Sequence, residues 1–133
     1  MTKLELIRAQ DFLRTTPTGE LDWEKTKEIF TAVARAAQDL CDFVISIDLR
    51  NIQTTTLTTI QVWDLAELLI SYGSVFTRKT ALLIPAEATG ADARFFEDCA
   101  HNRGFQIKVF KDFEEALDWL APPTEITTQQ LRG

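Results

Sequence analysis

The sequence predicts an α/β fold of the order β-β-α-β-α-β-α-β-α, with four helices and a mixed sheet whose core strands are parallel. The stretch 43–49 (FVISIDL) is rich in Val and Ile and lies between two helical patterns. This is typical of a buried parallel strand, although periodicity alone also fits a buried helix segment. The stretch 79–84 (KTALLI) is a second strand of this kind. Because units of strand, helix and strand cross over right-handed, we expect the last three strands to be parallel.

Length and composition predict one globular domain. The chain has 133 residues, of which 45% are hydrophobic and 26% are charged, and this suffices for a core of its own. We place the domain at residues 1–121. The stretch 122–133 is polar and has no periodicity, so we expect a flexible tail there.

Charge and hydropathy limit the partners and the location. Twenty acidic residues against 14 basic ones give a net charge of −6, so nucleic acid and anionic membrane surfaces are expected to be repelled. Charged residues interrupt the first ten positions, and no run of about 18 apolar residues occurs, so we expect no signal peptide and no membrane insertion. The chain is therefore expected in the cytoplasm. Cys41 and Cys99 are far apart, which suits buried reduced thiols better than a disulfide or metal site.

The elements before the central strand are a hairpin and a helix. The stretches 3–8 and 12–15 are short extended candidates, and we interpret them as a terminal hairpin. Pro17 and Gly19 then mark a turn. From Asp22 onward apolar residues recur at steps of three and four, so this aspartate is expected to cap the first helix.

The central strand leads into an unusually apolar second helix. Asp48 and Arg50 follow the apolar run, and the threonine-rich stretch 54–59 is expected to be the loop before a helix from Leu57 to about Tyr72. Only two residues of that helix are charged, and both fall in one stripe. The apolar residues on the opposite side cover more than one core-facing stripe needs, and they are Val62, Leu65, Ala66, Leu69 and Ile70.

Two more helices and one strand complete the order. Thr89 and Asp92 have the spacing of a capping box for the third helix, and Gly104 is expected to end it in the left-handed conformation. The stretch 105–110 alternates apolar and polar residues, which predicts a strand near an edge of the sheet. The stretch 112–120 is expected to form the fourth helix before two prolines.

Three strings of the sequence resemble the STAS domain, and more closely its SpoIIAA-like branch, which is also compared with lipid-binding SEC14-type folds. They are GELD at 19–22, ISIDL at 45–49 and VFKDFEEALDWL at 109–120, and the similarity covers about Leu4 to Leu120. The resemblance implies a STAS/SpoIIAA-like fold and a non-enzymatic regulatory or scaffold role that acts through protein contacts.

The resemblance does not extend to the phosphorylation switch of this family. In its anti-sigma factor antagonists, a serine at the start of the second helix is phosphorylated by a partner kinase. Counting from Asp48 puts that position at Leu57, which cannot accept phosphate, with Thr56 and Thr58 on either side. We therefore predict that neither threonine is an obligatory switch. A capping or turn-forming role is the simpler interpretation of both.

The sequence predicts no enzyme and no cofactor. His101 is the only histidine and falls at a predicted helix end, and motifs for acyl transfer, zinc hydrolysis and nucleotide binding are missing. Asp48 with Arg50 could hold a polar ligand at the carboxyl edge of the sheet, where open α/β sheets usually bind ligands. A structural ion pair is the simpler interpretation of these two residues.

Two functions follow from these observations. The first is a regulatory or scaffold module that binds a protein partner or a second copy of itself through an exposed face of the second helix. The alternative is a carrier of a small apolar ligand or lipid in a SEC14-like pocket. An apolar cavity of some hundreds of Å³ would favour the carrier, and burial of the helix inside the monomer would argue against the homodimer. The expected binding residues are Asp48, Arg50, Thr56, Thr58, Val62, Leu65 and Leu69.

Overall fold

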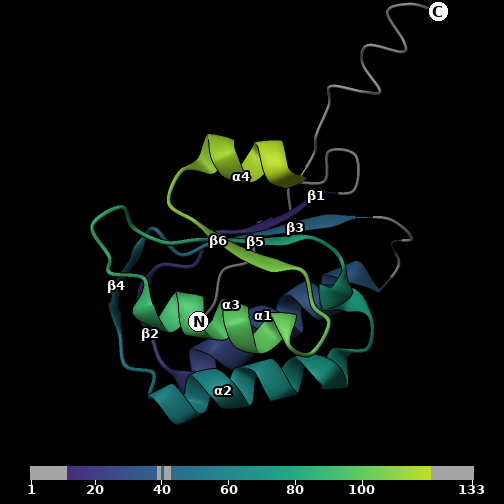
Figure 1. Ribbon diagram of the computed structural model, residues 1–133, viewed down its shortest axis with the longest axis horizontal. Helices are drawn as coiled ribbons and strands as arrows, with labels where there is room; N and C mark the ends of the chain where they lie inside the picture. Colours follow the sequence, from purple (N-terminus) through teal and green to yellow (C-terminus); the bar gives the residue numbers. More distant parts are fainter. Residues whose placement is uncertain (1–11, 39, 41–42, 121–133) are drawn as a thin grey trace, which may run out of the picture.

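A computed structural model describes residues 12–38, 40 and 43–120, and in this part of the chain a four-stranded parallel sheet separates two layers of helices (Figure 1). The strand order is β1-β3-β5-β6, and every neighbouring pair is parallel. The strands of this sheet are β1 (Phe12–Thr15), β3 (Val44–Asp48), β5 (Thr80–Leu83) and β6 (Ile107–Phe110).

Three helices cover one face of the sheet and one covers the other (Figure 1). The strand order follows the chain order, so right-handed crossovers bring α1, α2 and α3 to the same face. No further strand follows β6 in the described residues, and α4 packs on the opposite face. None of the described helices is both long and apolar enough to cross a bilayer. The helices are α1 (Trp23–Ala37), α2 (Thr59–Leu68), α3 (Ala91–His101) and α4 (Phe113–Leu120), with 3-10 turns η1 (Leu69–Tyr72) and η2 (Val75–Thr77).

The central position predicted for the stretch 43–49 is confirmed. β3 lies between β1 and β5, with Ile45 opposite Thr80 in the parallel register. Ile45 and Ile47 are fully buried in the core under α1, α2 and α3. The expected parallel pairing of the stretch 79–84 is also confirmed, since β5 pairs directly with β3.

The sequence missed a second, smaller sheet. β2 (Gly19–Leu21) and β4 (Ile52–Thr55) pair in parallel, where a turn and a loop were expected. Three of the four β4 residues are exposed, so this strand lacks the alternation of apolar and polar residues by which a half-buried strand is recognised in a sequence. The predicted strand 3–8, on which the hairpin and the mixed character of the sheet depend, lies outside the described residues, as do Cys41 and the tail 122–133.

The core has one large and one small cluster. Between the sheet and α1 to α3, the Phe30 ring packs 5.2 Å from Phe76 and 5.8 Å from Phe96 between centroids, a spacing that is favourable for aromatic pairs. The small cluster under α4 consists of Ala81, Leu83, Phe110, Ala116 and Leu120.

The helix ends confirm two of the three expected signals. Asp22 caps α1 by accepting the Lys25 amide at 2.8 Å, and Gly104 has the expected positive φ of 87°. The capping box predicted for α3 is wrong. Gly90 is the N-cap, with a left-handed φ of 78°. A Cβ at Gly90 would lie 3.2 Å from Cδ1 of Ile84, so both the backbone conformation and the close approach favour glycine.

Candidate functional site

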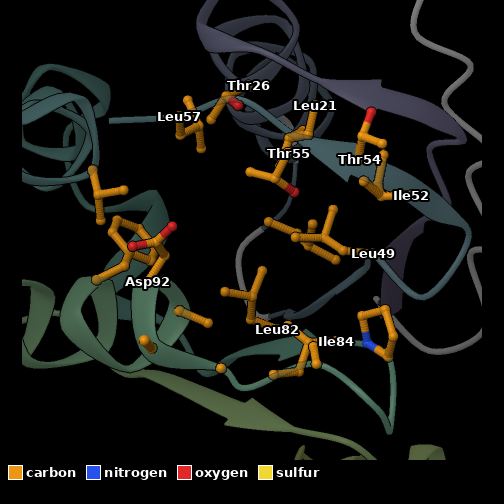
Figure 2. Close-up of a pocket in the computed structure, with 18 of the residues that line it drawn as sticks. Leu21, Thr26, Leu49, Ile52, Thr54, Thr55, Leu57, Leu82, Ile84 and Asp92 are labelled. Carbon is orange, nitrogen blue, oxygen red and sulfur yellow. The ribbon is translucent and has the colours of Figure 1, made fainter. Parts of the chain in front are cut away.

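A cavity of about 430 Å³ lies beyond the carboxyl ends of β3 and β5, on the face covered by α1, α2 and α3 (Figure 2). These helices, the small β2–β4 sheet and the loop before α3 form its walls. The apolar residues of the lining are Leu21, Ile29, Phe30, Ile47, Leu49, Ile52, Leu57, Val62, Leu65, Leu82, Ile84, Pro85, Ala88, Ala91, Ala93 and Phe96.

The alternation of side chains along β3 decides which residues reach this cavity. Ile47 and Leu49 point to the α1 side and line it, whereas Asp48 points to the α4 side. The Leu49 amide donates to the Leu83 carbonyl at 2.8 Å, so the backbone below the cavity is held by the main sheet.

Small side chains on one wall leave the space open. The loop before α3 and its first turn contribute Ala88, Gly90, Ala91 and Ala93 to the lining, where larger apolar residues would fill the volume. Protein interiors are normally packed to the density of organic crystals, so an opening of this size at the end of a sheet is a feature of ligand sites rather than of a closed core.

The mouth of the cavity is polar. Thr54 and Thr55 on β4 and Glu87, Thr89 and Asp92 on the opposite wall are exposed lining residues. Figure 2 shows Asp92 on the α3 side of the space, across from Leu49 and Thr54. The site therefore combines an apolar interior with hydroxyl and carboxylate groups at the entrance.

Asp48 and Arg50 lie at the predicted edge of the sheet but not in the cavity. The Arg50 guanidinium donates to both carboxylate oxygens of Asp48, at 2.9 and 2.8 Å, and the Arg50 amide donates at 3.1 Å. Arg14 donates to the same carboxylate at 3.2 Å. The guanidinium carbons of Arg14 and Arg50 lie 4.6 and 5.7 Å from the ring centroid of Phe113 on α4. This favours the structural interpretation of the pair.

The pKa of Asp48 reflects two opposing effects. Burial in the protein raises the pKa, whereas hydrogen bonds from Arg50 and Arg14 lower it, and the net result is a pKa below the ordinary value of 3.8. The hydrogen bond to Asp48 raises the pKa of Arg50. Asp48 is therefore held as a carboxylate between two guanidinium groups.

Thr58 has the capping role that was the simpler interpretation of the sequence. Its hydroxyl accepts the Gln61 amide at 3.1 Å, and its own amide donates to the Gln61 side chain at 3.0 Å, so a capping box begins α2. The Thr56 amide donates to the Leu21 carbonyl at 2.9 Å, next to the β2–β4 pair, and its side chain is exposed. Leu57, at the family's switch position, lines the cavity. That neither threonine is an obligatory phosphoswitch stays a prediction.

The apolar face predicted as an exposed interface is buried within the chain. Val62, Leu65 and Leu69 are only 3%, 5% and 0% exposed, because α2 packs against α3 and these side chains belong to the main core cluster. The expectation that these three side chains form a dimer surface is therefore wrong. Val62 and Leu65 instead line the cavity.

A different apolar stripe is exposed on α2 and η1. Ile60, Trp63 and Ile70 are 72%, 45% and 56% exposed. Their spacing of three and seven residues puts them on one side of the helix. The guanidinium of Arg103 lies 5.1 Å from the Trp63 ring centroid and donates to Glu67 at 2.6 Å, so it ties the end of α3 to this stripe. The sequence pattern grouped Ile70 with Val62, Leu65 and Leu69, whereas the structure puts Ile70 on this exposed side.

Groups that catalysis commonly uses are dispersed in the described residues. His101 is exposed in the last turn of α3, and Cys99 is a buried free thiol. Among the residues that the structure describes, no group of three or more His, Cys, Asp and Glu side chains is arranged to hold a metal ion.

Comparison with known proteins identifies the fold. No protein-family model and no curated protein matches the chain. The chain is similar to the solved structure of an uncharacterised protein from the DUF3478 family with a SpoIIAA-like fold, from Shewanella loihica PV-4. The TM-score is 0.59 and the sequence identity is 24%, over 89% of this chain and 92% of that chain. The resemblance read from the sequence is thus confirmed at the level of fold, and this chain has a SpoIIAA-like α/β fold.

Proposed function

We propose that the chain is a non-catalytic binding module that holds a small, mostly apolar ligand in the cavity beyond β3 and β5. The observation that carries the proposal is the cavity itself, whose volume of about 430 Å³ falls within the range of about 300–1,000 Å³ typical of small-molecule sites. The proposal includes one domain over residues 1–121 and the cytoplasmic location expected from the sequence.

The lining supports an apolar ligand body. The bottom of the cavity is formed by Ile47, Leu49 and Leu82. The polar lining residues are exposed except Thr26, whose hydroxyl donates to the Asp22 carbonyl at 2.6 Å. Each methylene group that moves from water into such a lining contributes about 0.8 kcal/mol. A saturated chain of about ten carbons would therefore gain several kcal/mol from desolvation before the cost of immobilising it is subtracted.

A dye-displacement measurement tests this proposal. We expect the neutral apolar dye Nile red to bind with increased fluorescence and to be displaced by decanol. Ala93→Phe and Thr55→Phe would fill the cavity from opposite walls and abolish binding, because both residues line it. Ala86→Phe is the matched control, since Ala86 is exposed and does not line the cavity. Binding that persists unchanged in both cavity-filling variants, each with native thermal stability, would contradict the proposal.

A second candidate function is a protein contact through the exposed stripe Ile60, Trp63 and Ile70. The observation in its favour is that three large apolar side chains follow one side of α2 and η1 in water. A second copy of the chain is the simplest partner, because a twofold contact needs only one self-complementary surface. Such contacts would also suit a regulatory or scaffold role, as the SpoIIAA-like fold suggests.

A further inference from the structure

The cavity ends at a common level on the three helices that line it. Because the strands are parallel, α1, α2 and α3 all begin at the carboxyl edge of the sheet, and only residues in about the first two turns of each helix line the cavity. The last lining residues on these helices are Phe30, Leu65 and Phe96. The next residues on the same faces are buried in the main core and do not line the cavity, and they are Val33, Leu69 and Cys99.

The sheet closes the cavity at the same level. Ile47 on β3 and Leu82 on β5 line the cavity and are partners in the parallel register. Ile45 and Thr80 are the partners two residues earlier on the same face, and both are fully buried and do not line it. The cavity is therefore closed toward the amino ends of the strands. We call the five residues that close it the blind end, and they are Phe30, Ile47, Leu65, Leu82 and Phe96.

Two aromatic rings make this end a tightly packed layer. Phe30 and Phe96 are 4% and 3% exposed, and their rings pack edge to face with 5.8 Å between centroids. Behind them, Phe76 is fully buried, packs 5.2 Å from Phe30 and does not line the cavity. Since such interiors are close-packed, a ligand cannot extend past this layer without displacing the rings.

We infer that the blind end limits the ligand of the proposed cavity to a single short chain or a small ring system. At about 30 Å³ per non-hydrogen atom, the share of one water molecule in the liquid, a volume of about 430 Å³ holds about 14 such atoms. A lipid with two chains of about ten carbons exceeds this limit. The inference rests on the proposed function and specifies the class of ligand.

Primary alcohols of increasing chain length test the size limit. Octanol, decanol and dodecanol stay below it, so each added methylene group should enter the cavity and raise the affinity about fourfold. Tetradecanol exceeds it, so its additional methylene groups should remain in contact with water. We therefore expect tetradecanol to bind as dodecanol does, within about twofold. Displacement of Nile red, with each alcohol below its solubility limit, measures the four affinities.

Two matched pairs of variants test whether the blind end sets the limit. Leu65→Ala and Phe96→Leu remove carbon atoms from the blind end, so in either variant tetradecanol should bind about tenfold more tightly than dodecanol. Leu69→Ala and Phe76→Leu remove the same atoms from fully buried positions that do not line the cavity, so the limit should stay as in the wild type. Circular dichroism identifies folded variants, and if Phe96→Leu does not fold, Leu65→Ala decides.

The possible results separate the size limit from the proposed function. In the wild type, a rise in affinity from dodecanol to tetradecanol as steep as that from decanol to dodecanol would overturn the limit, while decanol binding still supported the cavity. An unchanged limit in Leu65→Ala, or an equal shift in Leu69→Ala, would overturn the role of the blind end. Failure of every alcohol to displace Nile red, or equal binding of decanol by wild type and Ala93→Phe, would overturn the proposed function and the inference with it.

Discussion

At the scale of single residues, Asp48 stabilises the join between the sheet and α4. Its carboxylate is 3% exposed and accepts from Arg50 and Arg14, whose guanidinium groups stack on the Phe113 ring. A buried charge of this kind is stable only when it is paired, and removal of one partner leaves the others unsatisfied.

We expect Asp48→Asn to lower the free energy of unfolding by about 2 kcal/mol at pH 7, because hydrogen bonds to charged groups are lost. The effect should stay below that of a fully buried pair, since Arg14 and Arg50 both reach solvent. The pKa of Asp48 is lowered in the folded state from 3.8, so its contribution is present above that pH and is lost as the pH falls through the folded pKa. Urea unfolding at pH 7 and pH 2.5 measures both statements. If Asp48→Asn lowers the free energy of unfolding by the same amount at pH 7 and at pH 2.5, the predicted pH dependence is wrong.

Thr58 and Thr56 provide a matched pair at the start of α2. We expect Thr58→Ala to reduce the free energy of unfolding by about 1 kcal/mol, because the capping box is lost. Thr56→Ala should change it by less than about 0.5 kcal/mol, since the Thr56 side chain is exposed and its amide bond to Leu21 remains. Chemical unfolding of both variants measures this. Equal losses of unfolding free energy in the two variants would show that the Thr58 cap does not cause the effect of Thr58→Ala.

At the scale of elements, α2 has a buried face and an exposed face that the sequence did not separate. Helical periodicity predicted the helix and its apolar excess, but the apolar residues nearly encircle it. The change from α2 to the 3-10 turn η1 at Leu69 also shifts the angle between successive side chains. Which face is covered depends on the packing of α3, and a single helix pattern carries no information about that neighbour.

Substitutions on the two faces of α2 and η1 should have opposite results. Leu69→Glu buries a charge at a fully buried position and should unfold the protein, at a cost of several kcal/mol. Ile70→Glu, at the adjacent position, should leave the fold intact because that side chain is 56% exposed. If the stripe Ile60, Trp63 and Ile70 joins two copies, Ile70→Glu should also convert the dimer into a monomer. Circular dichroism and sedimentation velocity measure these outcomes, and a wild type that sediments only as a monomer would contradict the self-association.

The part of the candidate site that depends on local sequence was predicted, and the part that depends on distant segments was not. The carboxyl edge of the sheet was predicted from Asp48, because the end of a strand is visible in the sequence. Which face of the sheet carries the cavity was not predicted. Side chains alternate along β3, so a cavity lined by Ile47 and Leu49 cannot also be lined by Asp48. The walls from β2 and β4 were missed because pairing between two short exposed segments far apart in the chain leaves little local pattern.

At the scale of the whole molecule, the order of strands and helices was largely predictable. Val- and Ile-rich strands alternate with capped helices, and the right-handed crossover rule supplies their parallel pairing. The cavity was not predictable, since it is a volume left between seven helices and strands. Its small lining residues, such as Ala88 and Ala93, have no pattern that distinguishes them from ordinary surface or core alanines.

Ligand binding should stabilise the whole domain. A ligand that binds only the folded chain adds about 2.7 kcal/mol to the free energy of unfolding at a free concentration 100-fold above its dissociation constant. We therefore expect decanol to raise the melting temperature of the wild type and of Ala86→Phe but not of Ala93→Phe. Differential scanning calorimetry measures this. An equal rise in all three proteins would point to a general solvent effect and contradict binding in the cavity.

The order of the strands also has a consequence for the growing chain on the ribosome. Because the described sheet runs β1, β3, β5, β6, each strand that emerges joins an edge formed by its predecessor, and none has to insert between strands already paired. α4 is made last of the described elements, and it covers Ala81, Leu83 and Phe110. A nascent chain from which β6 has emerged but α4 has not would therefore have this sheet assembled with one apolar face bare, and at that stage it most needs protection from aggregation.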